Sequence, residues 1–158
     1  MTQPRAITVT VNGISYARTV EPRLLLADFL RGELGLTGTH VGCEHGVCGA
    51  CTVMLDGDSV RACLMFAVQA DGCRLETVEG LAPAGKMNTL QQAFHEHHAL
   101  QCGFCTPGML MTATDMMKKY PLADDDAIRD GLSGNLCRCT GYEHIVAAVR
   151  AAKAGGAR

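Results

Sequence analysis

The stretch Gly42–Val53 reads GCEHGVCGACTV and contains three cysteines, and a fourth follows twelve residues after the last of them. The four are Cys43, Cys48, Cys51 and Cys63, spaced C-x4-C-x2-C-x11-C. This spacing is typical of a [2Fe–2S] site, in which four thiolates converge on two irons. Gly42, Gly46 and Gly49 would allow backbone amides to approach the anionic sulfurs. Zinc is the alternative, because C-x2-C also occurs in zinc sites, but the glycine-rich C-x4-C-x2-C loop favours iron–sulfur.

A second group of four cysteines lies in the C-terminal half of the chain. Its members are Cys102, Cys105, Cys137 and Cys139, spaced C-x2-C-x31-C-x-C. Each close pair precedes a predicted helix, and the positive end of a helix stabilises a thiolate. The spacing alone is compatible with either a [2Fe–2S] cluster or a structural zinc ion.

The nine cysteines also bear on the compartment. The first ten residues, MTQPRAITVT, contain no apolar core of a secretory signal, so we expect a cytoplasmic protein whose thiols stay reduced. Under those conditions metal or redox chemistry explains the cysteines better than disulfides. The ninth, Cys73, is predicted to be a small buried side chain.

Composition excludes several classes of protein. The 158 residues carry 14 Lys and Arg against 16 Asp and Glu, a net charge of −2, and aromatics make up 4% with no Trp. A nucleic-acid-binding surface is therefore not expected. No apolar run is long enough to cross a bilayer. The chain also lacks the G-x-G-x-x-G and P-loop fingerprints of nucleotide binding, so no flavin or pterin domain is expected here.

The first half of the chain alternates like a sheet. Ile7, Val9 and Val11 share one face, and Asn12-Gly13 then predicts a tight hairpin turn. A helix is expected from Pro22, with Leu25, Phe29 and Leu30 forming its apolar stripe. Irregular loop follows to residue 51. Further strands are expected over 52–55, 59–62 and 73–78, with turns at 56–57 and 71–72.

The second half is predicted to be helical. Asn88 with Gln91 forms a capping-box pattern, and Thr106-Pro107 predicts an N-cap followed by proline in the first turn. A short helix over 124–130 and a final one striped by Tyr142, Ile145, Val146 and Val149 complete this half, and the tail 151–158 is expected to fray. The predicted domains are 1–78, β-rich and holding the first cysteine group, a linker at 79–87, and 88–158, helical and holding the second.

Three motifs in this order resemble one protein family. GCEHGVCGACTV at 42–53, QCGFCTPGM at 101–109 and GNLCRCTGY at 134–142 are similar to the small two-cluster iron–sulfur subunit of the molybdenum hydroxylases, such as xanthine dehydrogenase, aldehyde oxidoreductase and aerobic carbon monoxide dehydrogenase. The resemblance covers 7–149. It implies an α+β fold, with a plant-ferredoxin-like β-grasp domain followed by a C-terminal four-helix bundle. It also implies two [2Fe–2S] clusters, each held by one cysteine group.

The same resemblance implies a role and partners. The chain would be the electron-transfer subunit of an oxidoreductase and would carry no substrate chemistry itself. Its partners would be a large molybdopterin-binding subunit and a medium FAD-binding subunit, in a heterotrimer or a dimer of heterotrimers. Gln101 and Cys139 match family positions beside the pterin, so electrons would enter at the second cluster and leave from the first toward flavin. His40 departs from the family, which often has Lys there.

Two other functions remain open at this point. One is a free two-cluster ferredoxin that carries electrons between separate enzymes. The other is an interaction module stabilised by zinc. Co-purification with partner subunits distinguishes the subunit from the ferredoxin, and metal analysis distinguishes both from the zinc module.

Overall fold

The computed structural model describes residues 3–155. Its N-terminal hairpin forms as the sequence predicts: β1 (Arg5–Val11) pairs antiparallel with β2 (Ile14–Val20). Asn12 and Gly13 have φ of 51° and 81°, the left-handed values that a type I′ turn requires. The alternating apolar residues of β1 are buried, which confirms the predicted inner face.

Five strands form one mixed sheet in the order β2-β1-β5-β3-β4. β3 (Thr52–Leu55) lies where predicted, whereas β4 (Asp58–Arg61) and β5 (Arg74–Glu76) end earlier than expected. β5 runs parallel to β1 and antiparallel to β3. Cys73, at the turn into β5, is partly exposed, so its predicted burial is wrong. Two short 3₁₀ turns, Ala62–Leu64 and Ala67–Ala70, lie between β4 and β5, and a third, Val78–Gly80, follows β5.

The first helix begins later than predicted. Leu25 is extended and forms an antiparallel bridge with Phe66, so α1 (Leu26–Asp28) starts four residues after Pro22. A wider π-type turn, Phe29–Glu33, continues it. Phe29 and Leu30 are fully buried, as their spacing predicts, whereas Leu25 lies before the helix and pairs with Phe66.

Four helices make up the second half: α2 (Thr89–Glu96), α3 (Thr106–Lys119), α4 (Asp125–Leu132) and α5 (Glu143–Gly155). The Asn88 capping box at the start of α2 is confirmed, with Gln91 returning the hydrogen bond at 2.8 Å. Asp124 caps α4 by accepting from the Ala127 amide at 2.9 Å.

Three helix ends differ from the prediction. Cys105, not Thr106, occupies the N-cap of α3, and the Thr106 hydroxyl is buried without a hydrogen-bond partner. Tyr142 lies outside α5 in a left-handed conformation. Helix α5 continues to Gly155, so the expected fraying is wrong over 151–155, and 156–158 lie outside the described residues.

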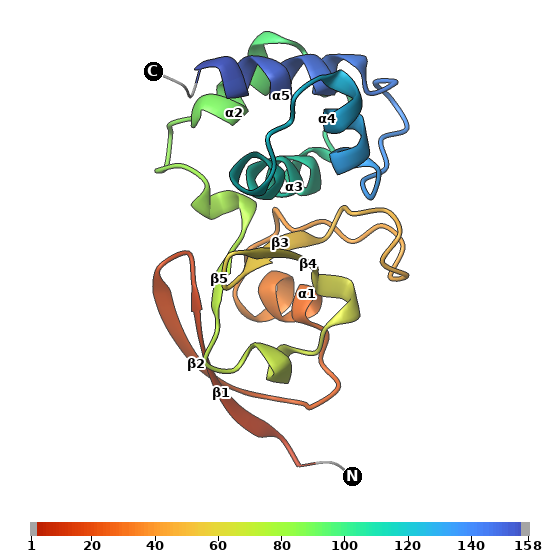
Figure 1. Cartoon of the computed structure of the whole chain (residues 1–158). Helices are drawn as coiled ribbons and strands as arrows, with labels where there is room; N and C mark the ends of the chain where they lie inside the picture. Colours follow the sequence, from red (N-terminus) through yellow and green to blue (C-terminus); the bar gives the residue numbers. More distant parts are fainter. Residues whose placement is uncertain (1–2, 156–158) are drawn as a thin grey trace.

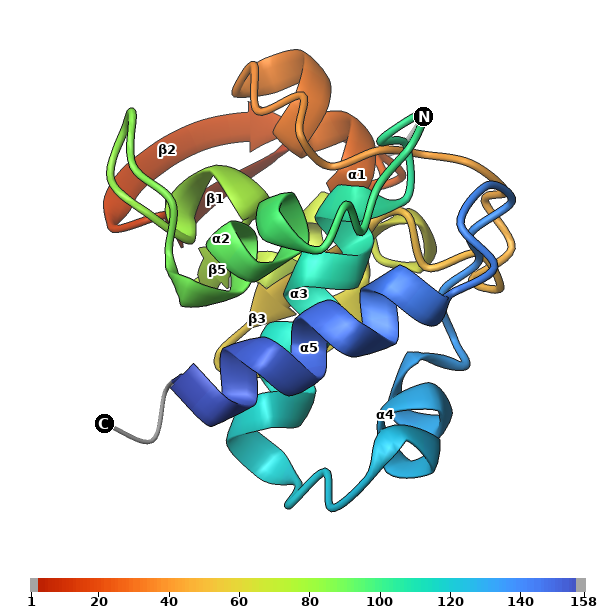
Figure 2. The ribbon, with the colours of Figure 1, turned by 90° about the horizontal axis from the view of Figure 1, so that it is seen from above.

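Each half has its own apolar core, and the predicted α+β class is confirmed. Figure 1 shows the sheet and α1 in one layer and the four helices above them, with α3 nearest the sheet. Viewed from above in Figure 2, α5 and α2 lie over α3. Helix α3 contacts β3 and β4 directly. Among residues 3–155, no helix has the length and apolarity needed to cross a membrane.

Polar side chains join the two halves beside this contact. The Asp115 carboxylate on α3 accepts from the Ser59 hydroxyl at 2.6 Å and pairs with Lys119 Nζ at 2.7 Å. Lys119 Nζ also reaches Asp58 at 2.6 Å. Arg61 on β4 donates to the Gly134 carbonyl, in the loop after α4, at 2.8 Å. These bonds hold the two cysteine-bearing regions in a fixed relation.

Candidate metal centres

The first cysteine group gathers around the β3–β4 hairpin. Cys43, Cys48 and Cys51 lie in the loop before β3, and Cys63 lies in the 3₁₀ turn after β4. The hairpin returns the chain, so that the Cys63 amide is 3.5 Å from Cys51 Sγ. Cys51 and Cys63 are 1% and 4% exposed, whereas Cys43 and Cys48 are only partly covered. The group therefore has an inner, buried pair and an outer pair.

The outer pair lies in a loop whose amides face sulfur. The His45 N–H points to Cys43 Sγ at 3.3 Å. This contact and the Cys48 amide lower the pKa of Cys43 to about 6, which favours the thiolate, the form that binds metal. A Cβ on Gly42 would lie 3.2 Å from Cys48 Sγ, so glycine leaves room for that sulfur.

Cys51, one of the inner pair, behaves differently. Burial raises the pKa of Cys51 to about 11, even though the Cys63 amide faces its sulfur. A thiol in this environment gives up its proton only when a cation takes the proton's place. Cys51 therefore depends on a bound metal to reach its ligand form.

The second group also divides by exposure: Cys102 and Cys139 are exposed, and Cys105 and Cys137 are partly covered. Cys102 and Cys105 lie in the turn before α3, and Cys137 and Cys139 lie in the loop between α4 and α5. Cys102 and Cys139 are exposed and their sulfurs are 3.5 Å apart. Burial, and then the neighbouring Cys137, raise the pKa of Cys105 to about 12. Burial also acts on Cys137, but the hydroxyl and amide of Thr140 outweigh it and lower the pKa of that thiol.

The donor set fits a [2Fe–2S] cluster in each group. The Cys102 and Cys139 sulfurs are 3.5 Å apart, and the Cys63 amide faces Cys51 Sγ, so cysteines from separate segments meet in each group. A [2Fe–2S] cluster takes two thiolates on each of its two irons. Backbone amides that face Cys43, Cys51 and Cys137 are the outer contacts that stabilise such anionic sulfurs.

The two cysteine loops touch each other. Figures 1 and 2 both show the loop before β3 beside the loop after α4. The Leu136 N–H donates to the Cys48 carbonyl at 2.9 Å. Next to it, the Asn135 amide donates to the Gly49 carbonyl at 3.2 Å and accepts from the Thr112 hydroxyl at 2.9 Å. Asn135 is 1% exposed, so this is a buried polar contact between the halves.

Helix α3 meets the first loop without an intervening side chain. A Cβ on Gly108 would lie 2.2 Å from the Gly49 carbonyl oxygen and 3.1 Å from Ala50 Cα. Gly49 itself has a φ of 71°, and a Cβ there would meet the Asn135 side chain at 2.6 Å. Close approach of two backbones is the reason for glycine at both positions.

The structure also places the remaining residues that the sequence singled out. Gln101 is exposed and precedes the exposed Cys102. His40 stacks on the Phe104 ring, with centroids 4.9 Å apart, and its Nδ1 is 2.8 Å from the Phe104 carbonyl oxygen. The sequence reasoning missed this stack, Asn135 and Gly108, because each acts across the two halves. The only available signal was their position inside the cysteine motifs.

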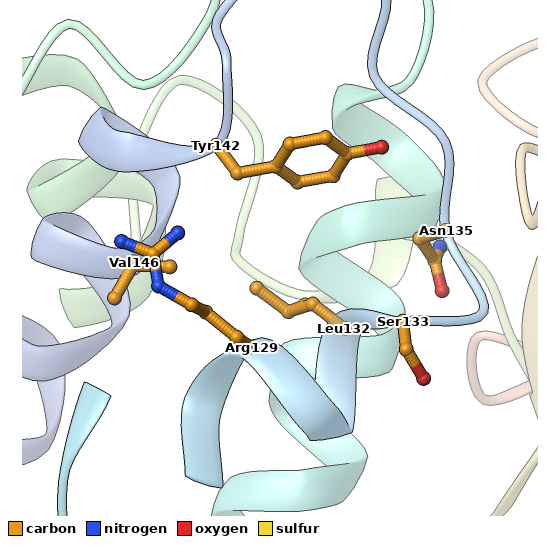
Figure 3. Close-up of a pocket in the computed structure, with 6 residues that line it drawn as sticks. All are labelled: Arg129, Leu132, Ser133, Asn135, Tyr142 and Val146. Atoms are coloured by element: carbon orange, nitrogen blue, oxygen red, sulfur yellow. The ribbon is translucent and has the colours of Figure 1, made fainter. Parts of the chain in front are cut away.

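A cavity of about 270 Å³ lies beside the second loop (Figure 3). Six residues line it: Arg129, Leu132, Ser133, Asn135, Tyr142 and Val146. The Tyr142 ring extends across it from the start of α5, and its hydroxyl accepts from the Cys137 amide at 2.9 Å. The cysteines themselves lie outside this cavity.

Comparison with protein families agrees with this arrangement. Residues 9–80 match the model described as a 2Fe-2S iron-sulfur cluster binding domain, and residues 77–150 match one described as a [2Fe-2S] binding domain. The chain therefore has two [2Fe–2S]-binding domains, one ferredoxin-like and one helical.

Individual relatives are similar over nearly their full length. The chain is 59% identical to the gamma subunit of caffeine dehydrogenase from Pseudomonas sp. (strain CBB1), over 91% of this chain and 88% of that one. It is 45% identical to the xanthine dehydrogenase iron-sulfur-binding subunit of Escherichia coli O157:H7, over 92% and 94%. A chain in the crystal structure of quinoline 2-oxidoreductase from Pseudomonas putida 86 superposes with a TM-score of 0.93 at 54% identity, covering 99% and 97%.

These matches define an iron–sulfur electron-transfer subunit of an oxidoreductase. The chain belongs to the [2Fe–2S] subunits of the molybdenum hydroxylase family.

Proposed function

We propose that this chain relays single electrons from a molybdopterin site on a large subunit, through its two [2Fe–2S] clusters, to FAD on a medium subunit. Cys102, Cys105, Cys137 and Cys139 hold the entry cluster, and Cys43, Cys48, Cys51 and Cys63 hold the exit cluster. A bound [2Fe–2S] cluster accepts and releases one electron at a time with little rearrangement. The paired thiols and the amides facing them support these ligand sets.

The Leu136–Cys48 hydrogen bond is the observation that carries the relay. It joins the backbone of one proposed ligand, Cys48, to the residue next to another, Cys137, at 2.9 Å. Cys48 and Cys137 are thus connected through one hydrogen bond and one intervening residue, Leu136. Beside it, buried Asn135 and the close approach of Gly108 hold the two loops together.

Exposure supports the direction of the relay. Cys102 and Cys139 are the exposed thiols of the second group, and exposed Gln101 lies next to them. We place the pterin of the large subunit against this edge, with Gln101 and Cys139 as its contacts. The flavin subunit then takes electrons from the outer pair of the first group, Cys43 and Cys48.

We divide the chain into two domains, one for each proposed cluster, joined by a linker. We place the ferredoxin-like β-grasp domain at 1–78, the linker at 79–87 and the helical domain at 88–158. In the helical domain α2 to α5 enclose one core, which supports a four-helix bundle. Because caffeine dehydrogenase and nicotine 6-hydroxylase relatives are named as subunits, we infer a heterotrimer or a dimer of heterotrimers for this chain.

Anaerobic metal analysis and partner capture test the proposal. The purified chain should contain about four irons and four sulfides, and reduction should produce two distinct electron paramagnetic resonance signals. Zinc without visible charge-transfer absorption would refute the cluster assignment. Expression together with a large molybdopterin-binding subunit and a medium FAD-binding subunit should yield a complex that contains molybdenum and flavin. A chain that purifies alone from that expression and reduces soluble acceptors would instead be a free ferredoxin.

A further inference from the structure

The loop from Cys137 to Tyr142 closes on itself around one sulfur. The Cys137 amide donates to the Tyr142 hydroxyl at 2.9 Å, and the Tyr142 amide donates to Thr140 Oγ1 at 3.1 Å. The Thr140 amide points to Cys137 Sγ at 3.4 Å, and Thr140 Oγ1 lies 3.1 Å from the same sulfur. The side chains of Thr140 and Tyr142 therefore both act on Cys137.

The direction of the hydroxyl–sulfur contact follows from its neighbours. Thr140 Oγ1 already accepts a hydrogen bond from the Tyr142 amide, which leaves its proton free to point elsewhere. A cysteine that binds metal is a thiolate and has no proton to give. Thr140 is therefore the donor, and Cys137 Sγ receives one hydroxyl and one amide hydrogen bond.

The backbone of this loop is bent in a way that tyrosine rarely adopts. Gly141 and Tyr142 have φ of 65° and 68°, two consecutive left-handed residues. Glycine takes this conformation freely, but a bulky side chain is disfavoured there. Figure 3 shows the Tyr142 ring extending away from its backbone with the hydroxyl at the far end. That hydroxyl accepts from the Cys137 amide. Strain at one residue is thus compensated by the contact that fixes the ligand.

We propose that Thr140 raises the reduction potential of the second cluster by donating a hydrogen bond to the Cys137 thiolate, and that Tyr142 positions both residues. The inference rests on the proposed ligand set. Reduction adds one electron to the cluster, and no bond breaks and no proton moves. The added negative charge strengthens a hydrogen bond donated to a ligand sulfur, so the donor favours the reduced state. Thr140 is a positioning and tuning residue, because it acts through Cys137.

Potentiometric titration of the intact chain, followed by electron paramagnetic resonance, tests the proposal. Thr140→Val removes the hydroxyl at nearly constant shape, and Thr140→Ser retains it. We expect Thr140→Val to lower the equilibrium constant for reduction of the second cluster about tenfold, equal to about 59 mV for a one-electron couple. Thr140→Ser should restore most of the shift. The first cluster is the internal reference and should keep its potential.

Thr106→Val is the matched control. It also removes a hydroxyl next to a proposed ligand, Cys105, but the Thr106 hydroxyl is buried without a hydrogen-bond partner. In Thr106→Val the reduction potential of the second cluster should equal that of the wild type. An unchanged potential in Thr140→Val, or an equal shift in Thr140→Ser or Thr106→Val, overturns the proposal.

A second variant covers the case in which Thr140→Val does not retain iron. Tyr142→Phe keeps every cysteine and Thr140 but removes the acceptor of the Cys137 amide, and it should lower the same potential. An unchanged potential in Tyr142→Phe then overturns the proposal. Failure of the proposed function is seen separately, as a wild-type chain with fewer than four irons or a single signal.

Discussion

Replacing Gly108 with alanine tests whether α3 and the first cysteine loop are in backbone contact. The added Cβ would lie 2.2 Å from the Gly49 carbonyl oxygen and 3.1 Å from Ala50 Cα. Both are backbone atoms of a loop fixed by Asn135, so they cannot turn aside as a flexible side chain would. The helix must therefore move away from the loop by roughly 1 Å to restore ordinary contact distances.

Two effects of opposite sign set the change in the free energy of unfolding of Gly108→Ala. Alanine is favoured over glycine inside a helix by about 1 kcal/mol. Overpacking against a fixed neighbour costs about 1 to 3 kcal/mol. Because the clash is with backbone, we take the upper part of that range and expect a net loss of about 1 to 2 kcal/mol. For a chain of this size that lowers the melting temperature by roughly 2 to 8 °C.

Gly131→Ala is the matched control for this prediction. Gly131 also lies within a helix, α4, and its added Cβ would meet Met116 Cε at 2.5 Å. That atom is the end of a flexible side chain, which can move at low cost. The propensity gain should then balance the repacking, and the melting temperature should stay near the wild-type value.

The assay is anaerobic thermal melting of the iron-loaded chain, with the magnetic coupling between the two reduced clusters as a second readout. Gly108→Ala should melt lower and show weaker coupling, because the helix domain moves away from the first loop. Gly131→Ala should change neither. If Gly108→Ala melts as high as Gly131→Ala with full coupling, the close backbone contact is refuted.

Three further predictions concern the sites and the contact between the domains. Cys139→Ser should remove or distort the second cluster's resonance signal and leave the first; loss of only the first would mean that the ligands are grouped wrongly. Gln101→Ala should retain both clusters but slow their reduction by substrate in the assembled complex, and an unchanged rate would contradict its contact with the pterin. Burial acts to raise the pKa of Asp115, but hydrogen bonds from Lys119 and Ser59 outweigh it and lower that pKa. Its stabilising contribution is thus present above the unfolded pKa and lost as pH falls through the folded value, so the melting-temperature difference between wild type and Asp115→Asn should shrink below about pH 4. A constant difference across that range would show that the carboxylate does not stabilise the contact.

Local sequence predicts this fold well wherever local chemistry decides it. Asn12-Gly13 permits one tight turn, and Asn88 with Gln91 caps one helix, so both were predicted and are confirmed. The helix expected from Pro22 begins only at Leu26, because Leu25 pairs with Phe66, a residue far along the chain. The apolar periodicity within 22–30 contains no information about a pairing with Phe66.

The same limit applies to the candidate sites. Both cysteine groups are visible as spacing patterns, because loops that wrap a cluster keep their ligands close in sequence. The contact between the groups is not visible, because Asn135 and Gly49 are separated by 86 positions. Thr106 shows the opposite error: a good N-cap residue followed by proline was expected to cap α3, but Cys105 occupies that position.

Docking of the two domains and the proposed electron route use the same atoms. Leu136 donates to the Cys48 carbonyl, and Asn135 beside it is buried against Gly49. The contact between the two domains is therefore also the contact between the two cysteine loops. A change that loosens the domains must therefore lengthen the route as well. Polar bonds at the far end of α3, such as Ser59 to Asp115, hold the same contact between the domains without touching a cysteine. A buried amide and two glycines, rather than a larger apolar contact, lie between the cysteine loops and let the two backbones meet directly, which keeps the proposed route short.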